Sequence, residues 1–440
     1  MCVFNSTAME KTENLEPAPD APWSWMKKFS FRFVGVYLLL YIFPFPVAYL
    51  PFTSFFTTAY SRLWEKIIDW VGLHIFDLVS ISHGMTGSGD RTHNYVELFT
   101  KLVLALLIGA IWTAVDRRST HYRKHYHWLT VWVRYYLGAL IIGYGFAKVF
   151  KTQFPFPGLA RLVENYGDSS PMGLAWNFMG YSKMFNLFTG LGEVIGGFLL
   201  FFRRTTTIGA FVLISVISTI VMMNFAYDIP VKLFSTHLLL MALFLLTPDI
   251  RRLYRFFISN EPVAPADLSS PITDKKWNTV RIVLKALFIS YAVLSQLYSG
   301  LQREKQWGDH KVKPPLYGIY EVETFIRNGD TIPPLLTEDR RWRRFIVPRY
   351  EGIGQVQYMD DQLTTYKFEA DSTLQTATLR ATESSPGGNI VLEHPDSNLL
   401  QLRGVFQADT LEVHLRKKDL NDFLLVNRGF HWINEVPYNR

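Results

Sequence analysis

The chain has 440 residues, a net charge of +7 and a hydrophobic content of 49%. Its single cysteine, Cys2, excludes an intramolecular disulfide, Cys-x-x-Cys thiol chemistry and a Cys-ligated iron–sulfur cluster. The basic residues lie in short clusters between apolar segments, which is typical of membrane topology signals and not of a nucleic-acid interface. The composition therefore predicts a polytopic membrane protein with a lipid bilayer as partner, a sizeable water-facing part and no nucleic-acid partner.

A polar tail over residues 1–26, predicted to be disordered, precedes a transmembrane domain over residues 27–300. Seven apolar segments in that domain are predicted to span the membrane. The first apolar stretch, Phe33–Ser61, carries no charge and is long enough to cross a hydrocarbon core of roughly 30 Å. The segment Arg62–Ser82 has apolar residues at helical spacing and is predicted to lie on the membrane surface or against the bundle. The seven predicted spans cover about residues 33–51, 96–115, 129–150, 184–202, 208–223, 229–247 and 277–300.

The arginine and lysine residues predict the orientation of these spans. With the N-terminus inside, the inner segments carry 16 of them and the outer segments carry 6. This asymmetry places the N-terminus in the cytoplasm and everything after residue 300 in the periplasm or outside the cell, as expected for a bacterial inner-membrane protein. The His-containing segment DRRSTHYRKHYH fits a cytoplasmic loop better than a metal site, since arginine and lysine dominate it.

The last part of the chain has a different pattern. Short runs that alternate between apolar and polar residues predict an antiparallel β barrel or sandwich over residues 343–440, outside the membrane. Residues 301–342 are expected to form a tether with one short amphipathic helix over Tyr320–Arg327. The eight predicted strands lie in RRFIVPRY, GQVQYMD, TTYKFEAD, LQTATLRAT, NIVLEH, LLQLRGVF, TLEVHLR and FLLVNRGFHWI.

Two of the apolar segments carry a recognisable motif. RYYLGALIIGYGFAKVF, with Arg134 and Lys148, and GLGEVIGGFLLFFRRTTTIGA, with Glu193, together resemble the DoxX family of integral membrane proteins. The resemblance covers roughly residues 129–248. It implies a four-helix core and a role near membrane redox chemistry, because some DoxX relatives are quinone-linked oxidoreductase subunits or partners of redox enzymes.

Ionisable residues inside the spans are the candidate catalytic groups. Glu193 and His237 lie roughly 12–13 Å below the outer face, and Lys148 lies near the outer end of its span. In a structural interpretation, Glu193 pairs with Lys148 or His237 and holds the helices together. In a functional interpretation, Lys148 or His237 donates to the carbonyl of a bound quinone and Glu193 moves the proton.

Five further residues are candidates for cofactor binding, each with a simpler alternative. Lys232 can reach the membrane interface, and Asp228, near Asn224, can cap the following helix. Trp176 and Tyr181 suit an aromatic anchor at the interface or a roof over the pocket.

The sequence is thus compatible with two classes of function. The first is a quinone-linked redox protein or subunit, working with a quinone or a redox partner protein. The alternative is a non-enzymatic membrane scaffold that presents the β-rich domain as a binding module outside the cytoplasm. Transport is less favoured, since no broken-helix repeat is evident.

Overall fold

The computed structural model describes residues 22–84, 86–266, 268, 272–371, 376–380, 388–396 and 398–439. Most of the predicted disordered tail lies outside the described residues, as do part of the segment 260–275 and residues 386 and 387. The described chain forms two compact units. The first comprises the described parts of Met1–Ile141, Ile195–Asn224 and Pro230–Ala292, and the second those of Ile142–Val194, Phe225–Ile229 and Val293–Arg440.

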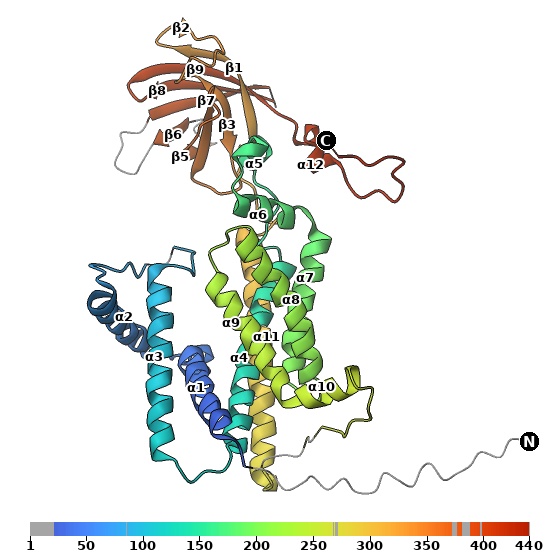
Figure 1. Ribbon diagram of the computed structural model, residues 1–440. Coiled ribbons are helices and arrows are strands. Elements are labelled where there is room, and N and C mark those ends of the chain that lie inside the picture. Colours follow the sequence, from blue (N-terminus) through green and yellow to red (C-terminus); the bar gives the residue numbers. More distant parts are fainter. Residues whose placement is uncertain are drawn as a thin grey trace, which may run out of the picture. The chain divides into compact units, whose positions relative to one another are not determined.

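Helices account for most of the described chain up to Trp307 (Figure 1). The α-helices of this part are α1 (Trp25–Ile42), α2 (Ser54–Phe76), α3 (Thr92–Val115), α4 (Arg123–Val149), α5 (Leu159–Leu162), α6 (Pro171–Tyr181), α7 (Lys183–Leu200), α8 (Thr206–Ala226), α9 (Lys232–Leu246), α10 (Ile250–Phe257) and α11 (Lys275–Trp307). Four of them, α4, α7, α8 and α11, contribute a segment to each unit.

Six helical segments in the described chain are long and apolar enough to cross a membrane. The predicted class, a helical membrane protein with a C-terminal β domain, is therefore confirmed. The span predicted over 184–202 is the helix α7, which falls outside these six because Lys183, Asn186 and Glu193 interrupt its apolar sequence. The six segments are Trp25–Tyr49, Thr92–Val115, Arg123–Val149, Thr206–Ala226, Lys232–Phe257 and Lys275–Trp307.

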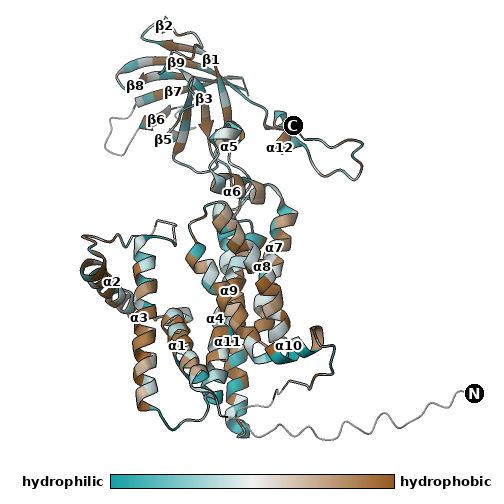
Figure 2. Ribbon diagram, viewed as in Figure 1, coloured by the Kyte–Doolittle hydropathy of each residue, from teal (hydrophilic) through white to brown (hydrophobic). Residues whose placement is uncertain are grey.

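The helix expected within Arg62–Ser82 is α2, in the first unit, which begins at Ser54 and ends at Phe76, before the predicted end. Its buried residues Trp64, Ile68 and Val71 recur at helical spacing and pack with Val96 of α3. The helix α3 is apolar over most of its length, as Figure 2 shows by its brown colour. The helix α2 therefore packs beside α3 through one apolar stripe, whereas α3 has the overall apolar composition of a membrane span.

Nine strands in the described part of the second unit form one antiparallel sheet in the order β2-β1-β3-β4-β5-β6-β7-β8-β9. An additional pairing between β1 and β9 closes eight of the strands into a barrel, with the two-residue strand β2 attached to β1. The strands are β1 (Gly318–Arg327), β2 (Asp330–Thr331), β3 (Trp342–Val347), β4 (Ile353–Tyr358), β5 (Leu363–Asp371), β6 (Thr376–Arg380), β7 (Gly388–Asp396), β8 (Leu399–Phe406) and β9 (Asp409–Lys417).

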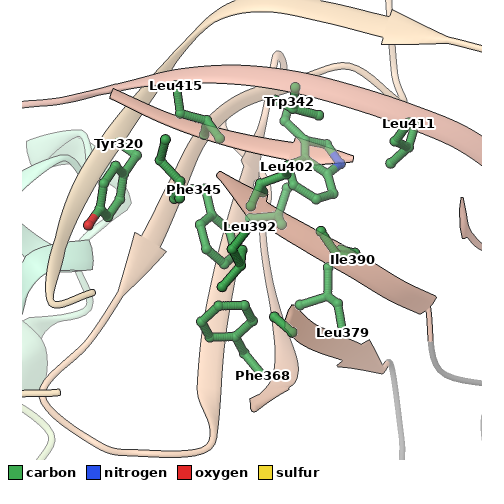
Figure 3. Close-up of a cluster of buried hydrophobic side chains, with 14 of the residues drawn as sticks. Tyr320, Trp342, Phe345, Phe368, Leu379, Ile390, Leu392, Leu402, Leu411 and Leu415 are labelled. Carbon is green, nitrogen blue, oxygen red and sulfur yellow. The ribbon is translucent and has the colours of Figure 1, made fainter. Parts of the chain in front are cut away.

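Apolar side chains fill the interior of the barrel (Figure 3). Alternate residues point inward, so Leu400 and Leu402 of β8 face Leu415 and Val413 of β9 in register. The buried Trp342 of β3 packs against Phe325 of β1 and Phe406 of β8, with ring centroids 6.0 and 5.9 Å apart, and is among the largest side chains of this core.

Two elements of the β domain differ from the sequence prediction. The segment Tyr320–Arg327, predicted as a helix in a tether, belongs to β1, so the domain begins at Gly318 and not at residue 343. This strand pairs with both β3 and β9, and such long-range pairing outweighs local helical periodicity. The final strand predicted in FLLVNRGFHWI is also wrong: that segment holds the short helix α12 (Leu424–Asn427) and irregular chain, because closure of the barrel leaves no free edge for it.

Candidate functional site

Lys148 and Glu193 form a buried ion pair in the second unit. Lys148 lies in the last turn of α4 and Glu193 lies near the middle of α7. The ammonium Nζ of Lys148 donates to both carboxylate oxygens of Glu193, at 2.8 and 2.9 Å, and Glu193 is fully buried. Of the two partners considered for Glu193, lysine is therefore the one present, and the pair links α4 to α7.

Glycines let these two helices approach closely around the ion pair. A Cβ atom on Gly145 would lie 2.8 Å from the carbonyl oxygen of Gly190, and one on Gly190 would lie 2.7 Å from that of Gly145. Only glycine tolerates such contact between two helix backbones. The same crossing is seen within the first unit, where a Cβ on Gly138 would meet the carbonyl oxygen of Gly197 at 2.9 Å.

His237, on α9 in the first unit, has a different set of partners. Its Nδ1 lies 2.6 Å from the carbonyl oxygen of Leu233, which can only accept, so Nδ1 carries the proton. In the neutral ring, Nε2 then accepts from the hydroxyl of Tyr37, with which it forms a hydrogen bond. The ring of Tyr41 stacks on the imidazole with centroids 4.3 Å apart.

A further charged residue, Lys101, which was not among the predicted site residues, lies beside this histidine. Lys101 on α3 is buried, pairs with Glu97 at 2.8 Å, and lies over the rings of Tyr41 and Trp64. Tyr41 thus contacts both Lys101 and His237. Lys101 and its partner Glu97 could have been recognised from the sequence, because they are the charged residues of the segment predicted as the second span, 96–115.

Asn224 and Lys232 lie at the adjoining ends of α8 and α9. Asn224 donates to the hydroxyl of Ser235 at 2.9 Å, and both side chains are buried. The backbone N–H groups of Lys232 and Leu233 donate to the two carboxylate oxygens of Asp90, at 2.7 and 2.9 Å. The capping position predicted for Asp228 is therefore filled by Asp90.

Trp176 and Tyr181 lie on α6, in the second unit. Trp176 packs edge-on against Phe154, with ring centroids 5.0 Å apart. Tyr181 donates its hydroxyl hydrogen to the carbonyl oxygen of Arg428 at 3.0 Å. The two residues thus tie α6 to the preceding loop and to the C-terminal segment.

Asp309 holds together three segments of the second unit, just after α11. Its carboxylate accepts from Lys151 Nζ at 2.7 Å, from the N–H of Phe156 at 2.8 Å and from Arg349 at 3.4 Å. Leu159 of α5, which follows Phe156 closely in the sequence, packs in a buried cluster with Ile319 and Ile346 of the barrel. These contacts fix the segment after α4 against the barrel strands.

The environment of Asp309 predicts a specific dependence of stability on pH. Burial acts to raise the pKa of Asp309, but hydrogen bonds from Lys151 and Phe156 and the charges of Lys151 and Arg349 outweigh it, so its pKa is lowered. A carboxyl with a lowered folded-state pKa stabilises the fold above its unfolded pKa, and this contribution is lost as the pH falls through the folded value. We expect the melting temperature of the full chain to fall below about pH 4.

The Asp309→Asn variant is expected to lose less stability over the same pH interval, because the titrating group is gone. The exposed Asp330 on β2 supplies the control, and Asp330→Asn is expected to follow the wild-type profile. Parallel profiles for wild type and Asp309→Asn would contradict the assignment.

A cleft of about 630 Å³ lies between the segment 160–168 and the β4–β5 end of the barrel, within the second unit. The two sides are separated by almost two hundred residues in the sequence. The lining carries four carboxylates, four side-chain amides and one guanidinium. It comprises Ala160, Arg161, Val163, Glu164, Asn165, Asp168, Gln355, Gln357, Asp360, Asp361, Gln362 and Leu363.

Asp361, in the turn between β4 and β5, organises this cleft. Its carboxylate accepts from Arg343, from Gln357 at 3.1 Å and from Asn165 at 3.4 Å. Arg161, the one cation among the described residues of the lining, is paired with Glu164. The lining therefore presents a net negative surface with amide groups that can donate or accept hydrogen bonds.

Comparison with known proteins gives one relative. No family model and no solved structure matches the chain. The chain is 36% identical over 116 residues to the uncharacterized protein YwoB of Bacillus subtilis (strain 168), and the match covers 24% of this chain and 75% of that protein. Because the similarity extends over most of YwoB, the chain belongs to the family of this Bacillus subtilis protein.

Proposed function

We propose that this protein is a membrane-anchored binding protein whose cleft beside the barrel takes a small, hydrophilic, positively charged ligand. The observation that carries the proposal is the excess of carboxylates over cations in the lining of the 630 Å³ cleft. A concave surface of one sign raises the local concentration of oppositely charged ligands. The amides of Asn165 and Gln357 supply hydrogen bonds that orient the ligand.

The barrel interior is a less suitable ligand site than this external cleft. Trp342, Phe345 and Phe368 are buried inside it together with aliphatic side chains from the other strands (Figure 3). Small barrels with a filled interior bind ligands at their rims or outer surfaces. The hydrogen bonds of Asp361 to Gln357 and Asn165 join the two sides of the cleft, and such preorganisation lowers the entropic cost of binding.

In this proposal the helices anchor the barrel outside the cytoplasm. The six apolar segments support the membrane anchor. The excess of basic residues in the inner segments supports a cytoplasmic N-terminus, and with α7 as a further span it supports a barrel on the opposite side. A protease added to intact spheroplasts is then expected to cleave the C-terminal segment but not the N-terminal tail.

Charge removal without loss of shape tests the cleft. We expect the double variant Asp168→Asn/Asp360→Asn to bind spermidine roughly fivefold more weakly than the wild type, since each exposed charge contributes modestly. Asparagine preserves the acceptor that Asp360 offers to the N–H of Gln362. Calorimetry on the purified full chain measures the affinity.

The matched control is Asp330→Asn/Glu338→Gln, which removes two acidic groups outside the cleft lining. It is expected to bind spermidine like the wild type. Glucose and citrate serve as neutral and anionic probes of similar size. Stronger binding of either one, or equal affinities for the two double variants, would overturn the proposal.

A second candidate, a quinone-linked redox protein, is motivated by the Lys148–Glu193 pair. The Lys148 ammonium has three N–H donors, and among the described residues Glu193 accepts from two of them. The third donor remains for a ligand carbonyl. A DoxX-like four-helix core over 129–248 is part of the same proposal. Solvent extraction of the purified protein tests it: absence of quinone, with no reduction by quinol donors, would exclude this candidate.

A further inference from the structure

A second cavity, of about 560 Å³, lies entirely within the first unit. It is formed by the first half of α4, the turn after α7 and the first half of α11, with Leu268 at one side. None of its lining residues belongs to the barrel cleft or to the ion pair of Lys148. The cavity is therefore independent of the sites described above.

Four basic side chains gather in this cavity: Arg134, Arg203, Arg281 and Lys285. Among the described residues, the lining contains no carboxylate that could neutralise Arg134, Arg281 and Lys285. Lys285 is subject to electrostatic repulsion from both Arg134 and Arg281. Like charges collected on apolar helices are costly unless an anion joins them.

Arg134 is the most deeply placed of the four, with only 4% of its surface exposed. Its Nε donates to the carbonyl oxygen of Leu200, the last residue of α7, at 2.8 Å. This bond satisfies an unpaired carbonyl at the helix end. Among the described residues, Leu200 is the hydrogen-bond partner of this side chain. The two Nη groups of Arg134 therefore remain as donors, in a planar fork that suits a phosphate.

Apart from His127, Tyr135 and Ser290, the rest of the lining is apolar, with Trp128, Val131, Ile282 and Ile289 among its members. Lys285 lies over the ring of Phe202, with 4.8 Å between Nζ and the ring centroid. Trp128 and Ile282 are about half exposed, so the cavity opens on the apolar surface of the helices. A ligand that fills it needs an anionic head and a hydrocarbon body.

We propose that this cavity binds an anionic membrane lipid, with the phosphate between Arg134, Arg281 and Lys285 and an acyl chain along α4 and α11. Basic pockets between transmembrane helices bind lipid phosphates by this combination of charge and apolar contact. The apolar opening favours a lipid over a free phosphate ion, which would leave that surface uncovered. The proposal is independent of the ligand proposed for the barrel cleft.

Native mass spectrometry of the full chain in detergent tests the proposal, with dioleoyl phosphatidylglycerol and dioleoyl phosphatidylcholine as probes. The two lipids have the same chains and differ in net charge. We expect wild-type protein to retain phosphatidylglycerol preferentially. The double variant Arg281→Gln/Lys285→Gln is expected to bind phosphatidylglycerol about tenfold more weakly than the wild type.

The matched control is Arg251→Gln/Arg255→Gln, which removes two exposed basic residues of α10 outside the cavity. It is expected to retain phosphatidylglycerol like the wild type. Equal retention of the two lipids, or equal loss in both double variants, would overturn the proposal. Thermal stabilisation by inorganic phosphate that matches the effect of phosphatidylglycerol would overturn it in favour of a soluble anion.

Single substitutions keep the test valid if the double variant does not fold. Lys285→Met removes the charge and retains the apolar stem over Phe202, whereas Lys285→Arg retains the charge. Weakened retention in Lys285→Met together with retention in Lys285→Arg supports the site. Identical behaviour of these two variants would contradict it.

Discussion

Replacing Lys148 with methionine is expected to destabilise the protein by about 3–5 kcal/mol. The substitution leaves the fully buried carboxylate of Glu193 without the ammonium that now donates to both of its oxygens. An unpaired buried charge is far less stable than a pair, and Glu193 would have to take up a proton to remain in place. Denaturant or SDS titration of the purified protein, followed by circular dichroism, measures the loss.

Two further variants separate the ion pair from nonspecific effects. Lys183→Met removes an exposed lysine at the start of α7 and is expected to change stability by no more than about 0.5 kcal/mol. The double variant Lys148→Met/Glu193→Gln carries no buried charge and is expected to recover part of the lost stability. Equal stability of Lys148→Met and Lys183→Met would show that the pair does not hold α4 to α7.

The same variants bear on the redox candidate. If the double variant folds and a quinone bound by the wild type is lost, the pair serves a ligand as well as the fold. If folding and ligand content change together, the structural role suffices. The measurement needed is quinone content per folded molecule in each variant.

Truncating Trp342 to alanine is expected to destabilise the barrel by about 3–5 kcal/mol. Trp342 is among the largest fully buried side chains, and its ring lies about 6 Å from those of Phe325, Phe345 and Phe406. Its removal opens a cavity that the closed ring of strands cannot collapse to fill. Hydrogen-exchange mass spectrometry of peptides from β3, β8 and β9 reports the loss locally.

Trp432 provides the matched control for this experiment. It lies in the C-terminal segment and is 91% exposed, so Trp432→Ala removes the same side chain without creating a cavity. Exchange in the barrel strands is expected to match the wild type in this variant. If Trp342→Ala also matches the wild type, the barrel core is not packed as described.

The candidate sites were only partly predictable from the residues. Glu193 was recognised because a charge in an apolar helix needs a partner, and its partner Lys148 was one of two proposed. His237 was recognised for the same reason, but its partners Tyr37 and Tyr41 were not, since they lie about two hundred residues earlier in the chain. The acidic cleft left no local signal, because its two sides meet only when α5 packs on the barrel.

The sequence by itself determined the properties that depend on neighbouring residues. Runs of apolar residues identify the membrane helices, and alternation of period two identifies strands such as β8 and β9, because burial of one face or stripe follows from local periodicity. The prolines at 44 and 46 account for the end of α1 at Ile42.

Only the tertiary structure decided which segments pair. Strand β1 forms because β3 and β9 offer it two edges, and the C-terminal segment stays outside the barrel because those edges are then occupied. Asp90 caps α9 from a distant loop, and Asp309 joins three segments, since a carboxylate bonds to whichever donors folding brings within reach. Strand edges, helix ends and charged side chains find their hydrogen-bond partners among groups that folding brings close in space, and local sequence does not encode that proximity.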